Sequence, residues 1–294
     1  MEKVLVTGAN GQLGIALQHN TVGTDGLAFY FTDIDTLDIC DKAAVSDFIR
    51  SHNIRIIVNC AAYTAVDRAE DEPELCAQIN TDAVRLIGEL AAEVDARVIH
   101  ISTDYVFDGL GEACHANIRP YLETDEPCPV SVYGKTKLAG EQALLATCKN
   151  AIIIRTAWLY SETGSNFVKT MLRLGKERDT LSIVNDQHGT PTYANDLAEA
   201  IKTILTANRL TPGIYHYTNE GSCTWYDFAK KIFELKGIRC IVNPITTASY
   251  PTRASRPAYS VLDKTKIKET FAVKIPPWEI SLAKCLQSES FSPI

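Results

Sequence analysis

The sequence predicts an α/β fold in which helices cover both faces of a parallel sheet. In the first 156 residues, short β-branched and apolar runs alternate with longer stretches of helical periodicity. Residues 54–60 are almost continuously apolar, as in a strand buried on both faces. A glycine-rich segment also joins the first strand to the first helix. Alternating strands and helices form a parallel sheet with right-handed crossovers.

The elements of the first half follow from these patterns in chain order. Val, Ile and Leu dominate the strand candidates, and Ala, Leu and Glu dominate the longest helix candidate. The predicted strands are residues 4–6, 27–32, 54–60, 97–102 and 151–156. The predicted helices are residues 12–19, 41–51, 74–94 and 133–147.

The second half is more mixed, and Pro and Gly become denser after Gly189. Helical periodicity marks residues 166–178, 196–207 and 225–236, and residues 213–217 read as a strand. We expect residues 1–160 to form a dinucleotide-binding domain, with later segments able to return to its sheet. Residues 161–294 are then mainly a smaller C-terminal substrate-binding lobe.

The composition narrows the function classes. The net charge of -7 argues against a general nucleic-acid or membrane-surface binder. The nine cysteines form no CxxC pair, which favours reduced thiols in a cytoplasmic protein. Cys114 and His115 are adjacent, but no second pair completes a metal site, so none is predicted. We expect no signal peptide and no membrane span.

Three glycines in the pattern GxxGxxG follow the first strand and open the first helix. Gly8 permits a tight turn, Gly11 lets the backbone approach a pyrophosphate, and Gly14 allows close packing of helix and strand. The helix N-terminus directs free N–H groups at the phosphates. A glycine-rich turn without a ligand is the alternative, but the strand before and the helix after favour a Rossmann-like, doubly wound nucleotide-binding fold.

Other candidate cofactor contacts follow the second and third strands. Asp33 stands where an acidic residue binds the adenosine ribose, which favours NADH over NADPH, although it could instead be a cap or turn residue. Asp38 and Ile39 could border the adenine. Small residues after the third strand, at the edge where a ligand should lie, would let the cofactor approach the backbone.

A candidate catalytic pair lies on the helix over 133–147. Tyr133 and Lys137 are spaced i, i+4 and share one face. An ammonium beside the phenol would lower its pKa, so that Tyr133 can act as acid or base. Thr103, at the end of the fourth strand, offers a hydroxyl to a substrate carbonyl. The alternatives are an exposed Tyr–Lys pair and a strand-end cap.

Together these motifs resemble the extended short-chain dehydrogenase/reductase family. Further stretches of the chain fit its branch that reduces nucleotide-linked keto sugars. They are residues 62–70, 102–109, 133–141, 155–158, 166–167, 185–192, 255–257 and 260–263.

The resemblance implies specific roles. It makes Thr103, Tyr133 and Lys137 catalytic, and it places Asp104 and Trp158 on the sugar nucleotide. It implies a Rossmann domain, a smaller C-terminal lobe and use of NADPH or NADH, which weakens Asp33 as a selective residue. The implied cofactor contacts, with the loop glycine Gly8 and the catalytic pair beside them, are Gly11, Gln12, Leu13, Asp33, Asp38, Ile39, Ala62, Tyr63 and Thr64.

The resemblance therefore implies an enzyme that reduces the C4 ketone of a dTDP-linked 4-keto-6-deoxyhexose, giving dTDP-L-rhamnose for polysaccharide precursors. The alternatives are a reductase or epimerase of another nucleotide sugar and a non-catalytic dinucleotide-binding regulatory subunit. The expected partner is a small nucleotide sugar, with no nucleic acid or membrane and with room for a homodimer. Residues 110–119 form a longer connection than the family usually has.

Overall fold

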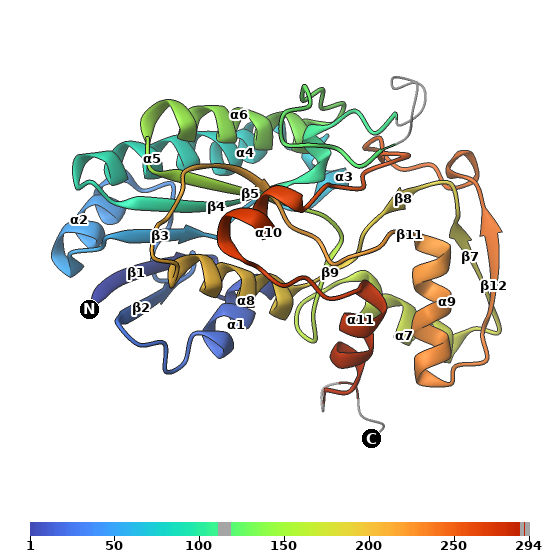
Figure 1. Cartoon of the computed structure of the whole chain (residues 1–294). Coiled ribbons are helices and arrows are strands. Elements are labelled where there is room, and N and C mark those ends of the chain that lie inside the picture. The colour runs from blue at the N-terminus through green and yellow to red at the C-terminus, as the bar shows by residue number, and fades with distance from the viewer. Residues whose placement is uncertain (111–118, 289–290, 292–294) are drawn as a thin grey trace.

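A six-stranded parallel sheet forms the centre of the larger part of the molecule (Figure 1). The computed structural model describes residues 1–110, 119–288 and 291. Its strand order, β2-β1-β3-β4-β5-β10, confirms the predicted doubly wound α/β fold. Every neighbouring pair of strands is parallel. The strands are β1 (Glu2–Thr7), β2 (Leu27–Thr32), β3 (Ile56–Asn59), β4 (Arg97–Thr103), β5 (Ala151–Thr156) and β10 (Gly213–His216).

Side chains on successive strand residues enter opposite cores, because a strand has a period of two. Ile56 and Val58 of β3 pack on one side, and Ile57 between them packs on the other. The first side is covered by α1 (Gln12–Asn20) and α8 (Ala194–Leu205), and the second by α2 (Lys42–His52), α5 (Ala83–Glu93) and α6 (Val132–Thr147) (Figure 1). Burial on both faces explains why these strands are almost wholly apolar.

The sheet reverses its direction of growth at β1, with β2 on one side and β3 on the other. In doubly wound sheets, ligands bind beyond the carboxyl ends of the strands at this reversal. Thr7 ends β1 and Asn59 ends β3, and the two residues are paired in the sheet register. The fold therefore fixes one edge, outside Thr7 and Asn59, as the place for a ligand.

Segments after residue 160 contribute to both parts of the molecule. β10 pairs with β5, and residues of α8 and α10 (Thr265–Phe271) belong to the core cluster on the α1 side of the sheet. The other segments build a second lobe with its own core. Its elements are β6 (Leu159–Tyr160), α7 (Phe167–Glu177), β7 (Thr180–Val184), β8 (His188–Gly189), β9 (Thr192–Tyr193), β11 (Cys223–Thr224), α9 (Trp225–Lys236), β12 (Ile241–Ile245) and α11 (Trp278–Leu286). In Figure 1, α9, β7 and β12 lie at the end of the molecule away from β1 and β2.

The helix predicted over 74–94 is not continuous. It begins as α4 (Pro73–Ala77), widens into a π-helical turn, η1 (Gln78–Asp82), and continues as α5. A π turn inserts i→i+5 hydrogen bonds into a helix and often marks a functional site. Among the short elements that the sequence patterns did not predict are α3 (Val66–Ala69), η2 (Asp104–Val106) and η4 (Thr247–Ser249).

Three sequence expectations concern features outside the site. Within the described ranges, no helix combines the length and apolar character that a membrane crossing requires. The cysteines in those ranges are free thiols. Cys114 and His115 lie outside the described residues, as does the rest of 111–118.

A buried ion pair fastens α6 to the sheet. Arg155 on β5 donates from Nη2 to Oε2 of Glu141 on α6 over 2.7 Å, and both side chains are only 1% exposed. Ser102 on β4 donates a further hydrogen bond to the same carboxylate. Removing one partner of such a pair leaves an uncompensated buried charge.

We expect Glu141→Gln to lower the free energy of unfolding by about 3–5 kcal/mol, because Arg155 loses its countercharge while staying buried. Urea denaturation monitored by fluorescence and circular dichroism measures this change. Glu177→Gln is the matched control, since Glu177 pairs with Arg173 where both are more than half exposed. That control should cost less than about 1 kcal/mol. Equal losses in the two variants would contradict the structural role of the buried pair.

Candidate active site

The predicted site residues lie along the carboxyl edge of the sheet. Gly8 follows β1, Asp33 follows β2, Ala62 follows β3, Thr103 ends β4 and Trp158 follows β5. Because the strands are parallel, their ends meet at one edge although the residues are far apart in sequence. The edge spans both the glycine loop and the candidate catalytic residues.

The glycine loop is shaped by contacts that a side chain would fill. Gly8 has a φ of +68°, and a Cβ there would lie 2.6 Å from the backbone nitrogen of Ala61. A Cβ on Gly14 would lie 2.3 Å from the carbonyl oxygen of Gly8. The α1 helix begins after Gly11 without a side-chain cap, so its first N–H groups face outward from the loop. These features fit a dinucleotide pyrophosphate at the helix N-terminus.

The side chains of Gln12 and Leu13 make contacts within the protein. Their backbone N–H groups are therefore what these residues can present to a ligand at the glycine loop. Gln12 Oε1 accepts hydrogen bonds from Ser161 Oγ at 3.0 Å and from Asn166 Nδ2 at 2.9 Å. Leu13 is buried in the core beneath α1. The contact of Gln12 joins the glycine loop to the start of the second lobe.

Asp33 also stabilises the glycine loop. Its Oδ2 accepts from the backbone nitrogen of Asn10 and its Oδ1 from that of Ile34, each over 2.8 Å. The residue is partly exposed, so its carboxylate keeps lone pairs for a ribose hydroxyl. The role of a turn residue and that of a cofactor contact are compatible here.

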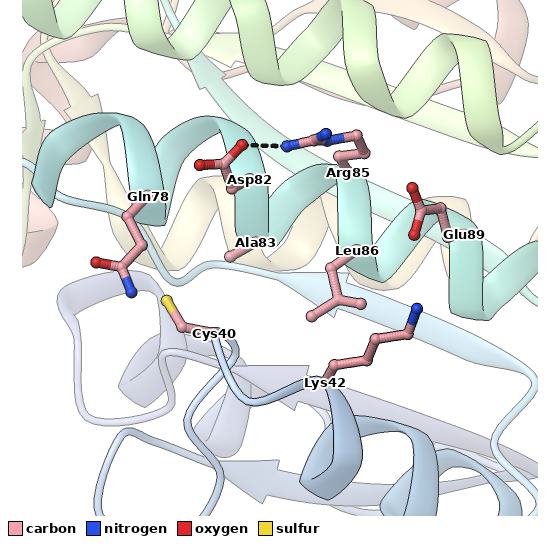
Figure 2. Close-up of a pocket in the computed structure, with 8 residues that line it drawn as sticks. All are labelled: Cys40, Lys42, Gln78, Asp82, Ala83, Arg85, Leu86 and Glu89. Atoms are coloured by element: carbon pink, nitrogen blue, oxygen red, sulfur yellow. Dashed lines mark hydrogen bonds and ion pairs between the residues drawn. The ribbon is translucent and has the colours of Figure 1, made fainter. Parts of the chain in front are cut away.

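A surface pocket adjoins the segment predicted to border the adenine. Ile39 is buried, and Asp38 accepts a hydrogen bond from the Cys40 backbone nitrogen at 2.9 Å. The pocket has a volume of about 260 Å³. Figure 2 shows Lys42 below Leu86 and Glu89 of α5, and the Asp82–Arg85 ion pair at the start of that helix. Its lining residues are Cys40, Lys42, Gln78, Asp82, Ala83, Arg85, Leu86 and Glu89, so Thr103 and Tyr133 are not among them.

The predicted contacts Ala62, Tyr63 and Thr64 lie in a loop that the π turn holds. The Asn80 side chain accepts from the Tyr63 backbone nitrogen at 2.9 Å and donates to the Tyr63 carbonyl oxygen at 3.1 Å. Tyr63 also donates its hydroxyl to Glu72 over 2.6 Å. Ala62 and Tyr63 are partly exposed and Thr64 is exposed, so the loop can reach a ligand.

The same π turn contacts the helix that carries Tyr133 and Lys137. Thr81 Oγ1 donates to the carbonyl oxygen of Thr136 at 2.8 Å. A Cβ on Gly140 would lie 2.1 Å from the carbonyl oxygen of Asn80, so the two backbones are in direct contact. The π turn thus positions the loop after β3 and α6 together, a role that the helical periodicity did not reveal.

Tyr133 is partly exposed at the start of α6, and its ring packs edge-on against Tyr105 at 5.5 Å. The expectation that a nearby ammonium lowers its pKa is wrong for this structure. Burial is the largest influence and raises the pKa of Tyr133, and a hydrogen bond with Thr103 opposes the increase. Tyr133 is therefore a protonated phenol at neutral pH.

Thr103 and Asp104 are buried at the end of β4. Thr103 Oγ1 donates to Asp104 Oδ1 over 3.1 Å and accepts from the Tyr105 backbone nitrogen at 3.2 Å. Burial raises the pKa of Asp104 to about 6, against the opposing effect of hydrogen bonds with Ser260 and Thr103. Thr103 therefore contacts Asp104 and also interacts with Tyr133.

Lys137 is 1% exposed, one turn along α6 from Tyr133. Its Nζ donates to the Ile101 carbonyl oxygen at 2.7 Å and lies 3.3 Å from His100 Nε2. Burial lowers the pKa of Lys137 to about 8, although the Glu141 carboxylate opposes this. His100, a polar residue between Ile99 and Ile101 of β4, was not predicted as a site residue.

Trp158 stands at the junction with the second lobe in a strained conformation. Its φ of +46° is in the left-handed region, which costs a non-glycine residue about 1–3 kcal/mol. The ring stacks on Trp225 with centroids 3.6 Å apart. A Cβ on Gly189 would lie 2.6 Å from indole Cε2, so only glycine admits the ring there. Trp225 was not predicted, because nothing in its sequence surroundings indicates the stack.

Comparisons with known proteins agree over almost the whole chain. The family described as "RmlD substrate binding domain" matches residues 1–291. The dTDP-4-dehydrorhamnose reductase of Aggregatibacter actinomycetemcomitans is 42% identical over 293 residues, which covers 96% of this chain and 97% of the relative.

Solved structures agree as well. A dTDP-4-dehydrorhamnose reductase from Clostridium acetobutylicum has a TM-score of 0.91 at 42% identity, covering 97% of this chain and 98% of that one. The corresponding reductase from Bacillus anthracis, solved in complex with NADP, has a TM-score of 0.90 at 39% identity with the same coverage.

The glycine loop yields a testable prediction. We expect Gly8→Ala to weaken NADPH binding by at least about 10-fold, because the methyl group would overlap the backbone at Ala61 and displace the loop. Fluorescence titration with NADPH measures the dissociation constant.

Gly23→Ala is a matched control, since Gly23 has a φ of +72° and a Cβ there would meet nothing within 4 Å. Both substitutions strain the backbone by about 1–2 kcal/mol, but only Gly8 meets a neighbour. Unchanged NADPH affinity in Gly8→Ala would remove the loop from the cofactor site.

Proposed function

The chain belongs to the RmlD family of dTDP-4-dehydrorhamnose reductases, and from that membership we propose how its own residues reduce the C4 ketone of dTDP-4-dehydro-L-rhamnose to give dTDP-L-rhamnose. The protein is an oxidoreductase that uses NADPH or NADH. Its product is a precursor for polysaccharide synthesis.

One observation supports the catalytic assignment most directly. Thr103, Tyr133 and Lys137 reach one edge of the sheet from β4 and α6, and Thr103 interacts with Tyr133. A hydroxyl that orients a carbonyl beside a phenol that can protonate it is what ketone reduction needs. The pairing depends on a contact between residues 30 positions apart, which is harder to obtain by chance than the Tyr–Lys spacing alone.

We assign the cofactor to the edge outside β1, β2 and β3. Gly8, Gly11 and the N–H groups of Gln12 and Leu13 would hold the pyrophosphate, and Asp33 would hold the adenosine ribose. Asp38 and Ile39 would border the adenine, and Ala62, Tyr63 and Thr64 would line the path toward Thr103. When bound, the reduced nicotinamide supplies the hydride for the substrate carbonyl carbon.

Tyr133 is the proton donor in this scheme. The phenol O–H bond breaks, and its proton goes to the C4 oxygen of the sugar as that oxygen gains negative charge. An alkoxide is a much stronger base than a phenolate, so the raised pKa of Tyr133 does not prevent the transfer. The raised pKa keeps the proton on Tyr133 until negative charge develops on the C4 oxygen of the sugar.

Thr103 and Lys137 support that step. Thr103 Oγ1 would donate a hydrogen bond to the carbonyl oxygen, exchanging its contact with Asp104 for one with the substrate. Lys137 would bind the nicotinamide ribose through its N–H groups. Asp104 would then be free to accept from a sugar hydroxyl.

The second lobe would bind the sugar nucleotide through Trp158. Trp225 stacks on this ring and Gly189 lies against its edge, so the orientation of the indole is fixed before a ligand arrives. A preorganised aromatic surface binds a deoxyhexose ring or a base at little entropic cost. The strained backbone at Trp158 is consistent with a functional constraint.

We also propose a cytoplasmic location and a homodimer. The nine cysteines without a disulfide pattern support the first. Sedimentation velocity at micromolar concentration tests the second, and a monomer across that range would contradict it.

We expect Tyr133→Phe to lower kcat by about 10²–10⁴-fold, because the substitution removes the phenol proton that the scheme transfers to the C4 oxygen. The NADPH dissociation constant should change by less than about 2-fold, since binding energy for the dinucleotide comes mainly from its phosphates. The assay follows loss of reduced-nicotinamide absorbance with dTDP-4-dehydro-L-rhamnose.

Tyr226→Phe, on α9, is the matched control and should retain full activity, as Tyr226 packs under Lys230 in the second lobe. A Tyr133→Phe enzyme that keeps most of its rate would refute the role of proton donor. Failure of the unaltered enzyme to oxidise NADPH or NADH with this sugar would refute the substrate assignment.

We expect Trp225→Leu to raise the KM for the sugar nucleotide about 2- to 10-fold, because Trp158 loses its stacked support. The NADPH dissociation constant should stay the same. Tyr226→Leu, at the next position of the same helix, provides the comparison. If Trp225→Leu instead weakens NADPH binding and leaves the sugar KM unchanged, the Trp158–Trp225 stack belongs to the cofactor site and the assignment to the sugar nucleotide is refuted.

A further inference from the structure

A row of buried polar groups crosses the sheet edge and ends at Lys137. Thr7 Oγ1 lies 2.6 Å from Asn59 Oδ1, and Asn59 Nδ2 lies 3.1 Å from His100 Nδ1. His100 Nε2 lies 3.3 Å from Lys137 Nζ. All four side chains are at most 2% exposed. In the absence of bulk water, each hydrogen must have a definite place in this row.

The backbone N–H of Ala61 sets the direction of the row. It lies 3.2 Å from the Asn59 side-chain oxygen, and a backbone N–H can only donate. The Asn59 amide must therefore present its oxygen to Ala61 and Thr7 and its NH₂ group to His100. The opposite orientation would set two donors against each other at Ala61. His100 Nδ1 consequently accepts a hydrogen bond.

The direction of the row determines the proton position on His100. Complete burial keeps the pKa of His100 well below its ordinary value, so the ring is neutral. A neutral ring that accepts at Nδ1 carries its proton on Nε2. That N–H points at Lys137 Nζ, where an amine lone pair can accept it. An ammonium group has no lone pair, so its N–H groups would oppose the His100 donor.

We propose that His100 is a positioning residue that favours the uncharged amine of Lys137, with the orientation enforced through Asn59 by the backbone of Ala61. The proposal builds on the role given to Lys137 above. Its tests examine the free chain and need no turnover, so its failure would leave the reductase assignment unaffected.

Other groups around Lys137 raise its pKa and oppose the effect of burial. Burial lowers the pKa of Lys137 to about 8, while Glu141 on α6, Cys76 on α4 and Cys60 after β3 raise it. Tyr133 precedes it by one turn of α6. The His100 donor acts together with burial, and both favour the uncharged amine of Lys137 near neutral pH. The amine keeps two N–H groups, so Lys137 can donate to the nicotinamide ribose in either protonation state.

The first test determines the tautomer of His100 by ¹⁵N NMR of histidine-labelled protein, with the signal assigned by His100→Gln. The expected pattern is a protonated Nε2 and an unprotonated Nδ1 from pH 6.5 to about 9. Asn59→Asp should reverse it, because a carboxylate can only accept and would draw the proton to Nδ1. A protonated Nδ1 in the unaltered chain would overturn the proposal.

The second test titrates Lys137 through ¹³C labelling at lysine Cε, assigned by Lys137→Arg. The expected midpoint in the free chain is about 8, against about 10.4 for surface lysines. His100→Gln can present a carbonyl oxygen to the ammonium and should raise the midpoint by about one unit or more, and Asn59→Asp should do the same.

His216→Gln is the matched control, because His216 is also fully buried but bonds to the Tyr121 carbonyl oxygen and lies on β10, which β5 separates from the β4 strand of His100. It should leave the Lys137 midpoint unchanged. If His100→Gln does not fold, Asn59→Asp still tests the direction of the row. A midpoint equal to that of surface lysines in the unaltered chain, or one unmoved in both variants, would overturn the proposal.

Discussion

The buried Glu141–Arg155 ion pair is the interaction on which the site geometry depends. It fixes α6 to the ends of β4 and β5, while the backbone contact between Gly140 and Asn80 fixes the same helix to the π turn. With α6 held on both sides, Tyr133 and Lys137 are positioned at the sheet edge. A desolvated ion pair contributes little net stability, but its directional hydrogen bonds allow only one placement of the helix.

Much of the fold could be predicted from the sequence, because periodic burial leaves a strong pattern. The predicted ranges 27–32, 151–156 and 225–236 coincide with β2, β5 and α9. The two-residue strands of the second lobe are too short for any periodicity. The break in the predicted helix over 74–94 was missed, because it depends on the contacts of Asn80 and Thr81 with residues 17 and 55 positions away.

In the candidate site, too, features set by local sequence could be predicted and features set by long-range contacts could not. The positions of Gly8, Thr103, Tyr133 and Lys137 could be predicted because motif spacing and strand ends are local features. The supporting groups His100, Asn80 and Trp225 act through long-range contacts, which a single sequence does not display. The expected lowering of the Tyr133 pKa was wrong because spacing on a helix says nothing about burial, which is the largest influence on this phenol.

The π turn between α4 and α5 also has a geometric consequence. A turn closed by i→i+5 bonds holds about one residue more than an α-helical turn. Each residue of an α-helix advances the chain by about 100° of rotation and 1.5 Å of rise. The α4 and α5 helices therefore form one continuous helix, in which the extra residue of the π turn rotates the faces of α4 relative to those of α5. Deleting a single residue between 78 and 82 would restore a regular helix and rotate the face of α4 that carries Cys76 away from α6, although every remaining side chain would be unchanged.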